Sequence, residues 1–433
     1  MAKVEHTRTT DSSALPNWTS VRLGSVLKEA DVRARDVPGI DGAPVLSLTK
    51  NLGLIPQEER FHHRVARADV SDYKVLKSGW LVYNPYVIWE GAIRALTTRP
   101  IGLVSPVYVT WEVSGADPRF IDYMVRTPTL LSEFSRLSSG VVQRRRSIRK
   151  TFFQDIEILL PPLDEQRAIA RTLRAVEQAK EATEKVIATT RELKRSLMRH
   201  LFTYGPAPFD QTGNIALREA DFGPVPAHWR VQPLSECGVI QSGVTKGRKL
   251  DKSAVVEVPY LRVANVQDGF LDLRDVKTIT IKKDELERYR LQVGDVLFTE
   301  GGDIDKLGRG HIWRGEVDTC VHQNHIFAVR PDVEQLSPEY LSYLVQSPYG
   351  KAYFLRVGHR TTHLASINQA KLAAFPVLIP PRKEQEDIVR MLAAVERKIE
   401  VEMHRQDCLA RLFDSLVSDL MAGRRRVMQP EVA

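Results

Sequence analysis

The chain has 433 residues, of which 43% are hydrophobic and 27% are charged. This length predicts two or three domains that each bury a core, and the composition excludes wholesale disorder. The net charge of +8 favours a polyanionic partner, although such a charge is also common in proteins that never bind nucleic acid. Three cysteines, far apart and odd in number, argue against a disulfide framework and favour a reducing compartment: Cys237, Cys320 and Cys408.

Residues 1–16 are polar, and we expect them to form a flexible N-terminal arm rather than a signal peptide. No apolar run in the chain approaches the roughly 18 residues that a membrane-spanning helix needs. We therefore expect a protein without a membrane partner.

Residues 17–158 are expected to form a first globular head. Apolar runs bounded by turn residues predict strands, and a longer run predicts a helix, at 45–48, 80–83, 102–109 and 118–135. The head ends in a basic segment, and clustered basic residues neutralise DNA phosphates and release counterions. A charged run is commonly only a solvated face, so the segment needs independent support. Its candidate DNA contacts are Arg144, Arg145, Arg146, Arg149 and Lys150.

An internal repeat supplies that support. Residues 159–177 align without a gap with residues 378–396, at an offset of 219 residues, and both segments contain Pro-Pro-x-x-Glu-Gln. Such a period is too long for a solenoid and indicates a duplicated domain with a duplicated helix, related by pseudo-two-fold symmetry. In the second copy the place of the basic segment is taken by three further candidate contacts, His359, Arg360 and Thr361.

Each Pro pair ends a strand and opens a long spacer helix, expected within 159–204 and 378–423. A helix over 163–202 would be about 60 Å long, which favours an antiparallel coiled coil over a core helix of one head. Apolar or small residues at alternating three- and four-residue steps form a narrow seam. The seam comprises Ile169, Leu173, Val176, Lys180, Thr183, Ile187, Thr190, Leu193, Leu197 and Leu201, and in the second copy Ile388, Leu392, Val395, Ile399, Glu402, Gln406, Leu409, Leu412, Leu416 and Leu420.

Between the copies, residues 205–226 are rich in Gly and Pro and predict an irregular linker. The second head, residues 227–377, has strands predicted at 258–263, 276–281, 295–299 and 326–329, and a helix at 338–355. Both heads are therefore expected to be α/β, or α+β, with mixed sheets. Residues 424–433 are expected to form a basic tail.

Loops on a rigid sheet are common places for residues that read DNA. Arg suits guanine, Asn and Gln suit adenine, and carboxylates suit cytosine, although each such side chain can equally serve as a turn or scaffold residue. The candidate contacts in the loops of the second head are Thr245, Lys246, Arg248, Lys249, Glu300, Arg309, Gln323 and Asn324.

Two motifs suggest chemistry that we do not expect. Residues 84–86, Asn-Pro-Tyr, resemble the Asn-Pro-Pro-Tyr motif of adenine methyltransferases but lack one proline, so a strand-ending turn is expected. The segment 320–325 and the nearby histidines lack the paired spacing of a zinc site, so no metal is expected. The chain also lacks a Gly-rich ATP-binding loop with Lys-Ser/Thr.

The two Pro-Pro-x-x-Glu-Gln helix starts, together with residues 260–273, 294–303, 307–310 and 322–325, make the chain resemble a type I restriction-modification specificity subunit. The resemblance covers nearly the whole chain and is weaker in the first head. It implies two target recognition domains that each read half of a split sequence in double-stranded DNA. It also implies that the helices set the spacing between these domains.

The resemblance further implies two modification (methyltransferase) subunits docked on the helices, and restriction (motor-nuclease) subunits that join afterwards. S-adenosylmethionine, ATP and Mg would belong to those partners, with no cofactor and no catalytic residue in this chain, in the cytoplasm of a bacterium or archaeon. The expected subunit interface lies at the helix starts: Glu165, Gln166, Ile169, Leu173, Glu384, Gln385, Ile388 and Leu392.

Two other functional classes remain open at this point. The chain could be a stand-alone methyltransferase or nuclease, which would show turnover without a partner. It could also be a coiled-coil adaptor that binds only protein, which would show no affinity for DNA.

Overall fold

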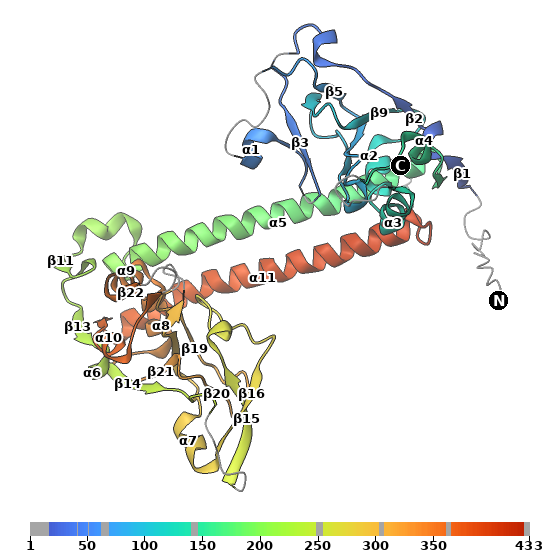
Figure 1. Ribbon diagram of the computed structural model, residues 1–433. Coiled ribbons are helices and arrows are strands. Elements are labelled where there is room, and N and C mark those ends of the chain that lie inside the picture. The colour runs from blue at the N-terminus through green and yellow to red at the C-terminus, as the bar shows by residue number, and fades with distance from the viewer. Residues whose placement is uncertain are drawn as a thin grey trace. The chain divides into compact units, whose positions relative to one another are not determined.

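The protein was analysed as a computed structural model that describes residues 17–40, 42–50, 52–61, 69–139, 146–247, 254–302, 307–360 and 365–427. The chain divides into two compact units (Figure 1). Unit 1 comprises Met1–Glu184 and His404–Ala433, and unit 2 comprises Lys185–Met403. Each unit therefore combines one head with a segment of each long helix.

The head of unit 1 is built around a four-stranded antiparallel sheet in the order β2-β9-β6-β7. Smaller pairs, β3 with β4, β5 with β8 and β1 with β10, complete its strands. In chain order the elements are β1 (Thr19–Arg22), β2 (Leu27–Glu29), β3 (Leu46–Thr49), β4 (Gly53–Pro56), α1 (Gln57–Phe61), β5 (Lys74–Lys77), β6 (Leu81–Tyr83), β7 (Ile93–Ala95), β8 (Ile101–Val104), β9 (Val109–Val113), α2 (Pro118–Met124), α3 (Pro128–Leu137), α4 (Lys150–Gln154) and β10 (Glu157–Leu160).

The head of unit 2 repeats this plan with the antiparallel order β14-β21-β17-β19. Its β15 pairs antiparallel with β16 and parallel with β20, which confirms the predicted mixed sheet. The elements are β11 (Leu217–Ala220), β12 (Gly223–Pro226), β13 (Arg230–Pro233), α6 (Leu234–Cys237), β14 (Gly238–Ser242), β15 (Val255–Leu261), β16 (Lys277–Lys282), α7 (Leu286–Tyr289), β17 (Val296–Thr299), β18 (Gly301–Gly302), β19 (Gly310–Ile312), β20 (Val321–His322), β21 (Ile326–Pro331), α8 (Pro338–Gln346), α9 (Pro348–Val357), β22 (His359–Arg360), β23 (Ala365–Ser366), α10 (Gln369–Ala373) and β24 (Pro376–Ile379).

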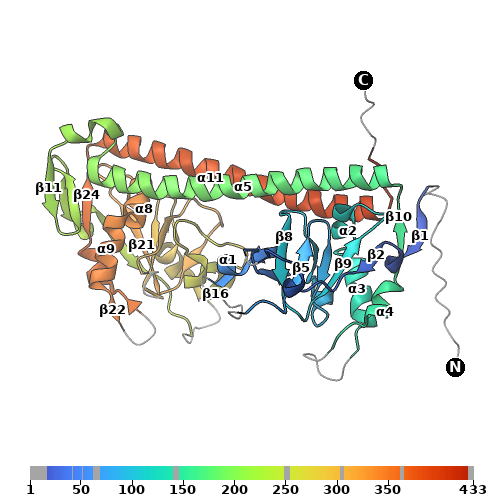
Figure 2. The same cartoon turned by 90° about the horizontal axis from the view of Figure 1, so that it is seen from above.

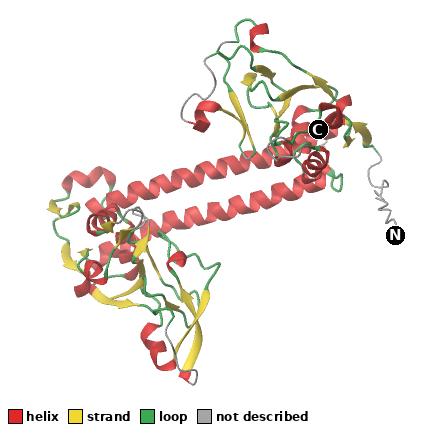
Figure 3. Cartoon of the chain, viewed as in Figure 1, coloured by secondary structure: helices red, strands yellow, loops and turns green. Residues whose placement is uncertain are grey.

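The two long helices are α5 (Leu163–Tyr204) and α11 (Arg382–Met421), and strands are confined to the heads and the linker between the copies (Figure 3). In unit 1, Gln406 Nε2 donates to Glu184 Oε1 at 3.1 Å, and in unit 2 Lys194 lies 2.6 Å from Glu396. Within each unit a segment of α5 therefore runs antiparallel beside a segment of α11, as predicted (Figure 1 and Figure 2). Among the described residues no helix is long and apolar enough to cross a membrane.

The seam differs from prediction at one pair of equivalent positions. Leu193 and Leu412, which stand 219 residues apart in the repeat, are 52% and 45% exposed. Thr183 and Glu402, polar members of the same predicted seam, are buried as expected. The seam positions that follow in each helix, Leu197 and Leu201 or Leu416 and Leu420, are buried again, so the departure is local.

Three predicted elements are each split in two by the local sequence. The run at 118–135 forms α2 and α3, and the run at 338–355 forms α8 and α9. Pro128 and Pro348 cannot continue a helix but suit a first turn, and the preceding Thr127 and Ser347 cap α3 and α9. The run at 102–109 likewise becomes β8 and β9, separated by a turn.

A glutamine at the start of α5 ties that helix to its head. The Gln166 side chain is 1% exposed, its Oε1 accepts a hydrogen bond from the backbone N–H of Asp117 at 2.8 Å, and its Nε2 donates to the Pro161 carbonyl at 2.8 Å. Asp117 is the N-cap of α2, so one amide fixes the start of the long helix against the start of a head helix.

The same arrangement recurs in unit 2. Gln385, also 1% exposed, accepts from the backbone N–H of Ser337, the N-cap of α8, at 2.9 Å. Its Nε2 donates to the carbonyls of Gln335 and Pro380, at 2.9 and 3.1 Å. The glutamine of each Glu-Gln motif, Gln166 or Gln385, therefore forms a buried hydrogen-bonded joint between a head and its long helix.

A second tie lies about three turns further along each long helix. The Tyr123 hydroxyl of α2 donates to Glu177 of α5, and the Tyr343 hydroxyl of α8 donates to Glu396 of α11, both at 2.5 Å. Around the ties, apolar side chains of head and helix form one core in each unit, which includes Leu173 in unit 1 and Leu392 in unit 2. Two hydrogen-bonded ties and a shared core hold each head to its helix segments as one body.

The second head also buries a histidine. His322 in β20 is 1% exposed, and burial lowers its pKa from 6.5 to about 4. Its neighbour Cys320 is buried as well, which raises the pKa of that thiol to about 12 and keeps it protonated as a donor to the Val321 carbonyl. Both side chains are part of the core of the head.

Replacing Gln166 by Ala is expected to lower the free energy of unfolding, because the Asp117 N–H and the Pro161 carbonyl would be buried without their partner. The expected loss is about 1–3 kcal/mol for each buried group left unpaired. Urea unfolding of the full chain measures this loss. Gln178→Ala, at an exposed position of the same helix, is the control, and equal stability of both variants would contradict the buried joint.

His322 predicts a pH dependence of stability. Since its folded pKa lies below its unfolded value, the unfolded chain binds a proton between pH 6.5 and about 4 that the folded chain does not. Stability from this residue is thus complete above pH 6.5 and falls by up to about 3 kcal/mol as the pH drops to 4. Urea unfolding across this range should show a shallower decline for His322→Gln than for wild type, and identical slopes would contradict the assignment.

Candidate DNA-binding surfaces

Three loops of the second head converge, and they carry most of the candidates predicted there. Val244 pairs with Gln323 through an isolated bridge, and the N–H of Asn324 donates to the Val244 carbonyl at 3.0 Å. The N–H of Glu300 donates to the His325 carbonyl at 2.9 Å. Thr245 and Lys246, which follow Val244 and are exposed, therefore belong to the same surface as Gln323, Asn324 and Glu300.

A small sheet brings a further segment to this surface. β23 pairs with β18 on one side and with β22 on the other, so His359 and Arg360 lie in the same small sheet as the strand that follows Glu300, with β23 between them. These candidates are separated by about 60 residues in sequence, and only the strand pairing unites them. Arg248, Lys249 and Thr361 lie outside the described residues.

Two of these side chains are held by neighbours rather than left free. Arg309 Nη1 donates to Gln267 Oε1 at 2.8 Å. Glu300 contacts His325 Nδ1 at 2.5 Å, and the side chains of Glu300 and His325 are 32% and 54% exposed. Gln267 and His325 were not among the predicted contacts. Such contacts would hold the Arg309 and Glu300 side chains in one orientation before DNA binds. Gln267 and His325 are therefore added to the candidate surface.

The basic segment of the first head divides into different roles. Arg146 is half-buried, stacks 4.9 Å from the Trp89 ring centroid and donates to the carbonyls of Ser135 and Ser138. These bonds give its guanidinium a structural role within the chain, and its role as a DNA contact stays a prediction. Arg144 and Arg145 lie outside the described residues.

The remaining two basic residues of that segment are exposed. Lys150 pairs with Glu29, whereas Arg149 lies 5.7 Å from the Phe152 ring centroid and makes no ion pair within the part of the chain that the structure describes. Since a surface ion pair contributes little, Lys150 can exchange Glu29 for a phosphate. Arg149 and Lys150 both remain available to a polyanion.

One backbone hydrogen bond occupies the same position in both heads. The N–H of Ile148 donates to the Pro85 carbonyl at 3.4 Å, and the N–H of Ile367, its equivalent in the repeat, donates to the Glu300 carbonyl at 2.8 Å. In each head this bond joins the loop after a central strand, β6 or β17, to the segment before α4 or α10. The two heads therefore present equivalent candidate surfaces built from different residues.

The predicted subunit interface at the helix starts is largely internal. Six of its residues are at most 1% exposed and are packed or hydrogen bonded within the chain, so they cannot form the predicted contact with another subunit: Gln166, Ile169, Leu173, Gln385, Ile388 and Leu392. Sequence periodicity identified the apolar face correctly but could not tell whether a head or a partner covers it.

The two glutamates of the predicted interface also bind within their own units. Glu384 accepts hydrogen bonds from the Trp229 indole at 2.8 Å and lies 2.7 Å from His228 Nε2. Glu165 lies 3.8 Å from Arg426 of the basic tail. Each carboxylate therefore already has a partner in the chain.

The motifs that suggested other chemistry serve structural roles. Residues 84–86 form the predicted turn after β6, in which the Tyr86 N–H donates to Asn84 Oδ1 at 3.1 Å. Across the described ranges no group of three His, Cys, Asp or Glu side chains is arranged to hold a metal ion. Cys320 and His322 belong to the core, as described above.

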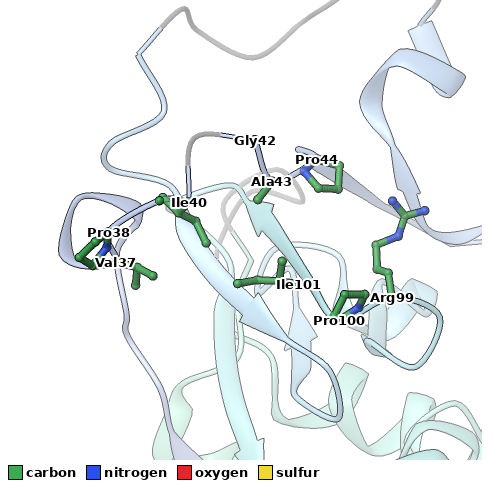
Figure 4. A pocket seen from close by; sticks show the side chains of 10 residues that line it. Val37, Pro38, Ile40, Gly42, Ala43, Pro44, Arg99, Pro100 and Ile101 are labelled. Carbon is green, nitrogen blue, oxygen red and sulfur yellow. The ribbon is translucent and has the colours of Figure 1, made fainter.

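An open pocket of about 510 Å³ lies in the first head (Figure 4). Among the described residues its lining contains one charged side chain, Arg99, and is otherwise apolar. The lining residues are Val37, Pro38, Gly39, Ile40, Gly42, Ala43, Pro44, Arg99, Pro100 and Ile101.

The chain is similar in sequence to several specificity subunits. It is 26% identical over 354 residues to the type I restriction enzyme MjaVIII specificity subunit of Methanocaldococcus jannaschii, which covers 79% of each chain. It is 27% identical over 184 residues to the putative MjaX specificity subunit of the same organism, covering 42% of this chain and 43% of that one. The match to the EcoKI specificity subunit of Escherichia coli is 26% identical over 276 residues, covering 63% and 57%. The chain thus spans about half the length of the last two relatives.

Two solved structures share the fold. A chain from a type I restriction-modification system, solved to explain complex assembly and conformational transition, aligns with a TM-score of 0.51 and 17% identity, covering 94% of this chain and 98% of that one. The type I restriction-modification S subunit from M. genitalium aligns with a TM-score of 0.53 and 14% identity, covering 93% and 96%.

The family model of the type I restriction modification DNA specificity domain matches residues 115–191 and 226–411. These segments lie in both copies of the repeat and together make up more than half of the chain. The chain therefore belongs to the family of type I restriction-modification DNA specificity proteins.

Proposed function

We propose that the chain is the DNA specificity subunit of a type I restriction-modification complex, and that each head reads one half of a bipartite sequence in double-stranded DNA. The observation that carries this proposal is the equivalent surface in the two heads. The same backbone bond, from Ile148 or Ile367, joins two loops there, while the surrounding side chains differ. Equivalent surfaces with different side chains suit the reading of two different half-sites.

The heads and the long helices have separate tasks in this proposal. Hydrogen bonds and apolar cores fix each head to its helix segments, so a change in helix length would move a whole head rather than deform its loops. The helices therefore set the distance between half-sites, and the loops set the bases. Phosphate contacts from groups such as Arg149 and Lys246 would supply affinity that depends on salt.

The chain carries no catalytic role in this proposal. Methylation and cleavage belong to two modification subunits and to restriction subunits, which bring S-adenosylmethionine, ATP and Mg. The complex acts on DNA in the cytoplasm of a bacterium or archaeon.

The burial of the helix starts moves the proposed docking surface further along the helices. Leu193 of α5 and Leu412 of α11 are exposed at equivalent positions of the repeat, although charged residues dominate the exposed faces of these helices. Each is flanked one turn away by uncharged exposed residues, Thr189 and Ser196 for one, Cys408 and Ser415 for the other. Two exposed leucines at equivalent positions, each beside uncharged side chains, suit two copies of one partner, the modification subunit.

Replacing residues 17–158 by the corresponding head of a relative is expected to change one half-site only, because each head reads independently. Selection of bound duplexes from a randomised pool, with the chain and its modification subunit present, measures this. As a matched test, removing four residues from both α5 and α11 should shorten the spacing by about two base pairs and leave both half-sites unchanged.

Failure to select any bipartite duplex with the wild-type complex would refute the proposed function. It would favour the protein-only adaptor. Methyl transfer by the purified chain alone would instead favour the stand-alone enzyme.

Leu193→Glu and Leu412→Glu are each expected to displace one modification subunit, because a buried unpaired carboxylate opposes docking. Native mass spectrometry should then show one modification subunit per chain for either single variant and none for the double variant. Leu52→Glu replaces a leucine that is 70% exposed in the first head and serves as the control. A full complement of two subunits in the double variant would place docking elsewhere.

A further inference from the structure

The turn after β6 has an exposed aromatic side chain that no role described above explains. Asn84 Oδ1 accepts a hydrogen bond from the backbone N–H of Tyr86, which closes a compact turn. The Tyr86 side chain is 45% exposed, whereas Tyr83, three residues earlier, is fully buried. A large aromatic ring is therefore held toward solvent on a short, braced turn.

A second exposed ring lies on the neighbouring helix. Phe152 of α4 is 41% exposed, and the adjacent Phe153 packs inward with its ring centroid 4.7 Å from that of Tyr83. The hydrogen bond from Ile148 to the Pro85 carbonyl joins the same two segments. Among the described residues of the first head, these two are the exposed aromatic side chains, and both lie where the β6 turn meets α4.

Positive charge lies next to one of the two rings. The Arg149 guanidinium lies 5.7 Å from the Phe152 ring centroid, and Arg146 is held nearby through Trp89 and the carbonyls of the α3 end. Exposed rings interleaved with arginines are typical of surfaces that bind nucleic acid, since the ring stacks on a base while the cation contacts the phosphate.

The repeat places this turn at a reading position. Ile148 and Ile367 are equivalent, and each donates to the loop after a central strand of its head. In the second head that loop begins with Glu300, a candidate reader, so in the first head the corresponding reader is the turn at residues 84–86. A tyrosine and a phenylalanine occupy the surface that in the second head carries mainly polar groups.

The geometry points to Tyr86 and Phe152 as base-contacting residues of the first head, which stack on or wedge between bases of its half-site in double-stranded DNA. This inference rests on the proposed function and extends it, because it assigns the first head a readout through local unstacking. The second head has no exposed aromatic in its equivalent described loop and reads by hydrogen bonding. Wedging of an apolar ring opens a base step and makes binding depend on how easily that step deforms.

The test uses the chain in complex with its modification subunit and a duplex selected by that complex from a randomised pool. Because a base stacked on an aromatic ring contributes a factor of about 5 to 150 in affinity, Tyr86→Ala and Phe152→Ala should each weaken binding at least about fivefold. Tyr86→Phe should bind nearly as wild type, since the ring is kept. Phe209→Ala, which removes a ring that is 61% exposed in the linker, is the matched control and should bind as wild type.

A second measurement reports unstacking directly. With 2-aminopurine placed in turn at each adenine of the half-site read by the first head, wild type and Tyr86→Phe should raise its fluorescence at one step. Tyr86→Ala should not, and probes in the other half-site should respond equally in all variants. Thermal unfolding of each variant verifies that the fold is kept.

The outcomes separate this inference from the proposed function. Selection of a bipartite duplex by wild type, with unchanged affinity and fluorescence in both alanine variants, would overturn the aromatic contact alone. Loss of the modification subunit from the alanine variants, with DNA affinity unchanged, would identify the rings as a protein contact and also overturn it. Failure of wild type to select any duplex would refute the proposed function itself.

Discussion

The amide hydrogen bonds of Gln166 and Gln385 are the constraint on which the rest of the structure depends. Each glutamine is buried and bonds the N-cap of a head helix and a carbonyl before its own long helix. An amide can satisfy both a donor and an acceptor at once, and a buried group left unpaired is costly, so these positions tolerate little change. The heads are thereby attached to the helices in one orientation, whatever residues their outer loops carry.

This joint explains why the two copies diverge unevenly. Near the joint the same contacts recur, as in the Tyr123–Glu177 and Tyr343–Glu396 pairs, because they depend on internal geometry. At the loop ends the backbone bond from Ile148 or Ile367 recurs, because a backbone bond requires no particular side chain. Side chains on those loops are therefore free to differ between the two heads, as the proposed reading of two unlike half-sites requires.

The candidate surfaces also show how charge alone misleads. Arg146 and Arg149 stand in the same basic run, yet Arg146 is held by Trp89 and two carbonyls while Arg149 is exposed. Sequence composition treats the two as equal. Their surroundings give one a structural role and leave the other to contact a polyanion, and the same distinction separates the buried glutamines from the exposed Leu193 and Leu412.

The sequence by itself determined the duplication, the two long helices, the mixed sheet of the second head and the family resemblance, because periodicity, Pro pairs and repeat offsets are local patterns. Only the tertiary structure decided that Gln385 faces its own head rather than a partner, that Leu193 leaves the seam, and that the strand after Glu300 shares a small sheet with His359 and Arg360. These outcomes depend on contacts between segments that are far apart in the sequence, and local sequence patterns do not specify such contacts.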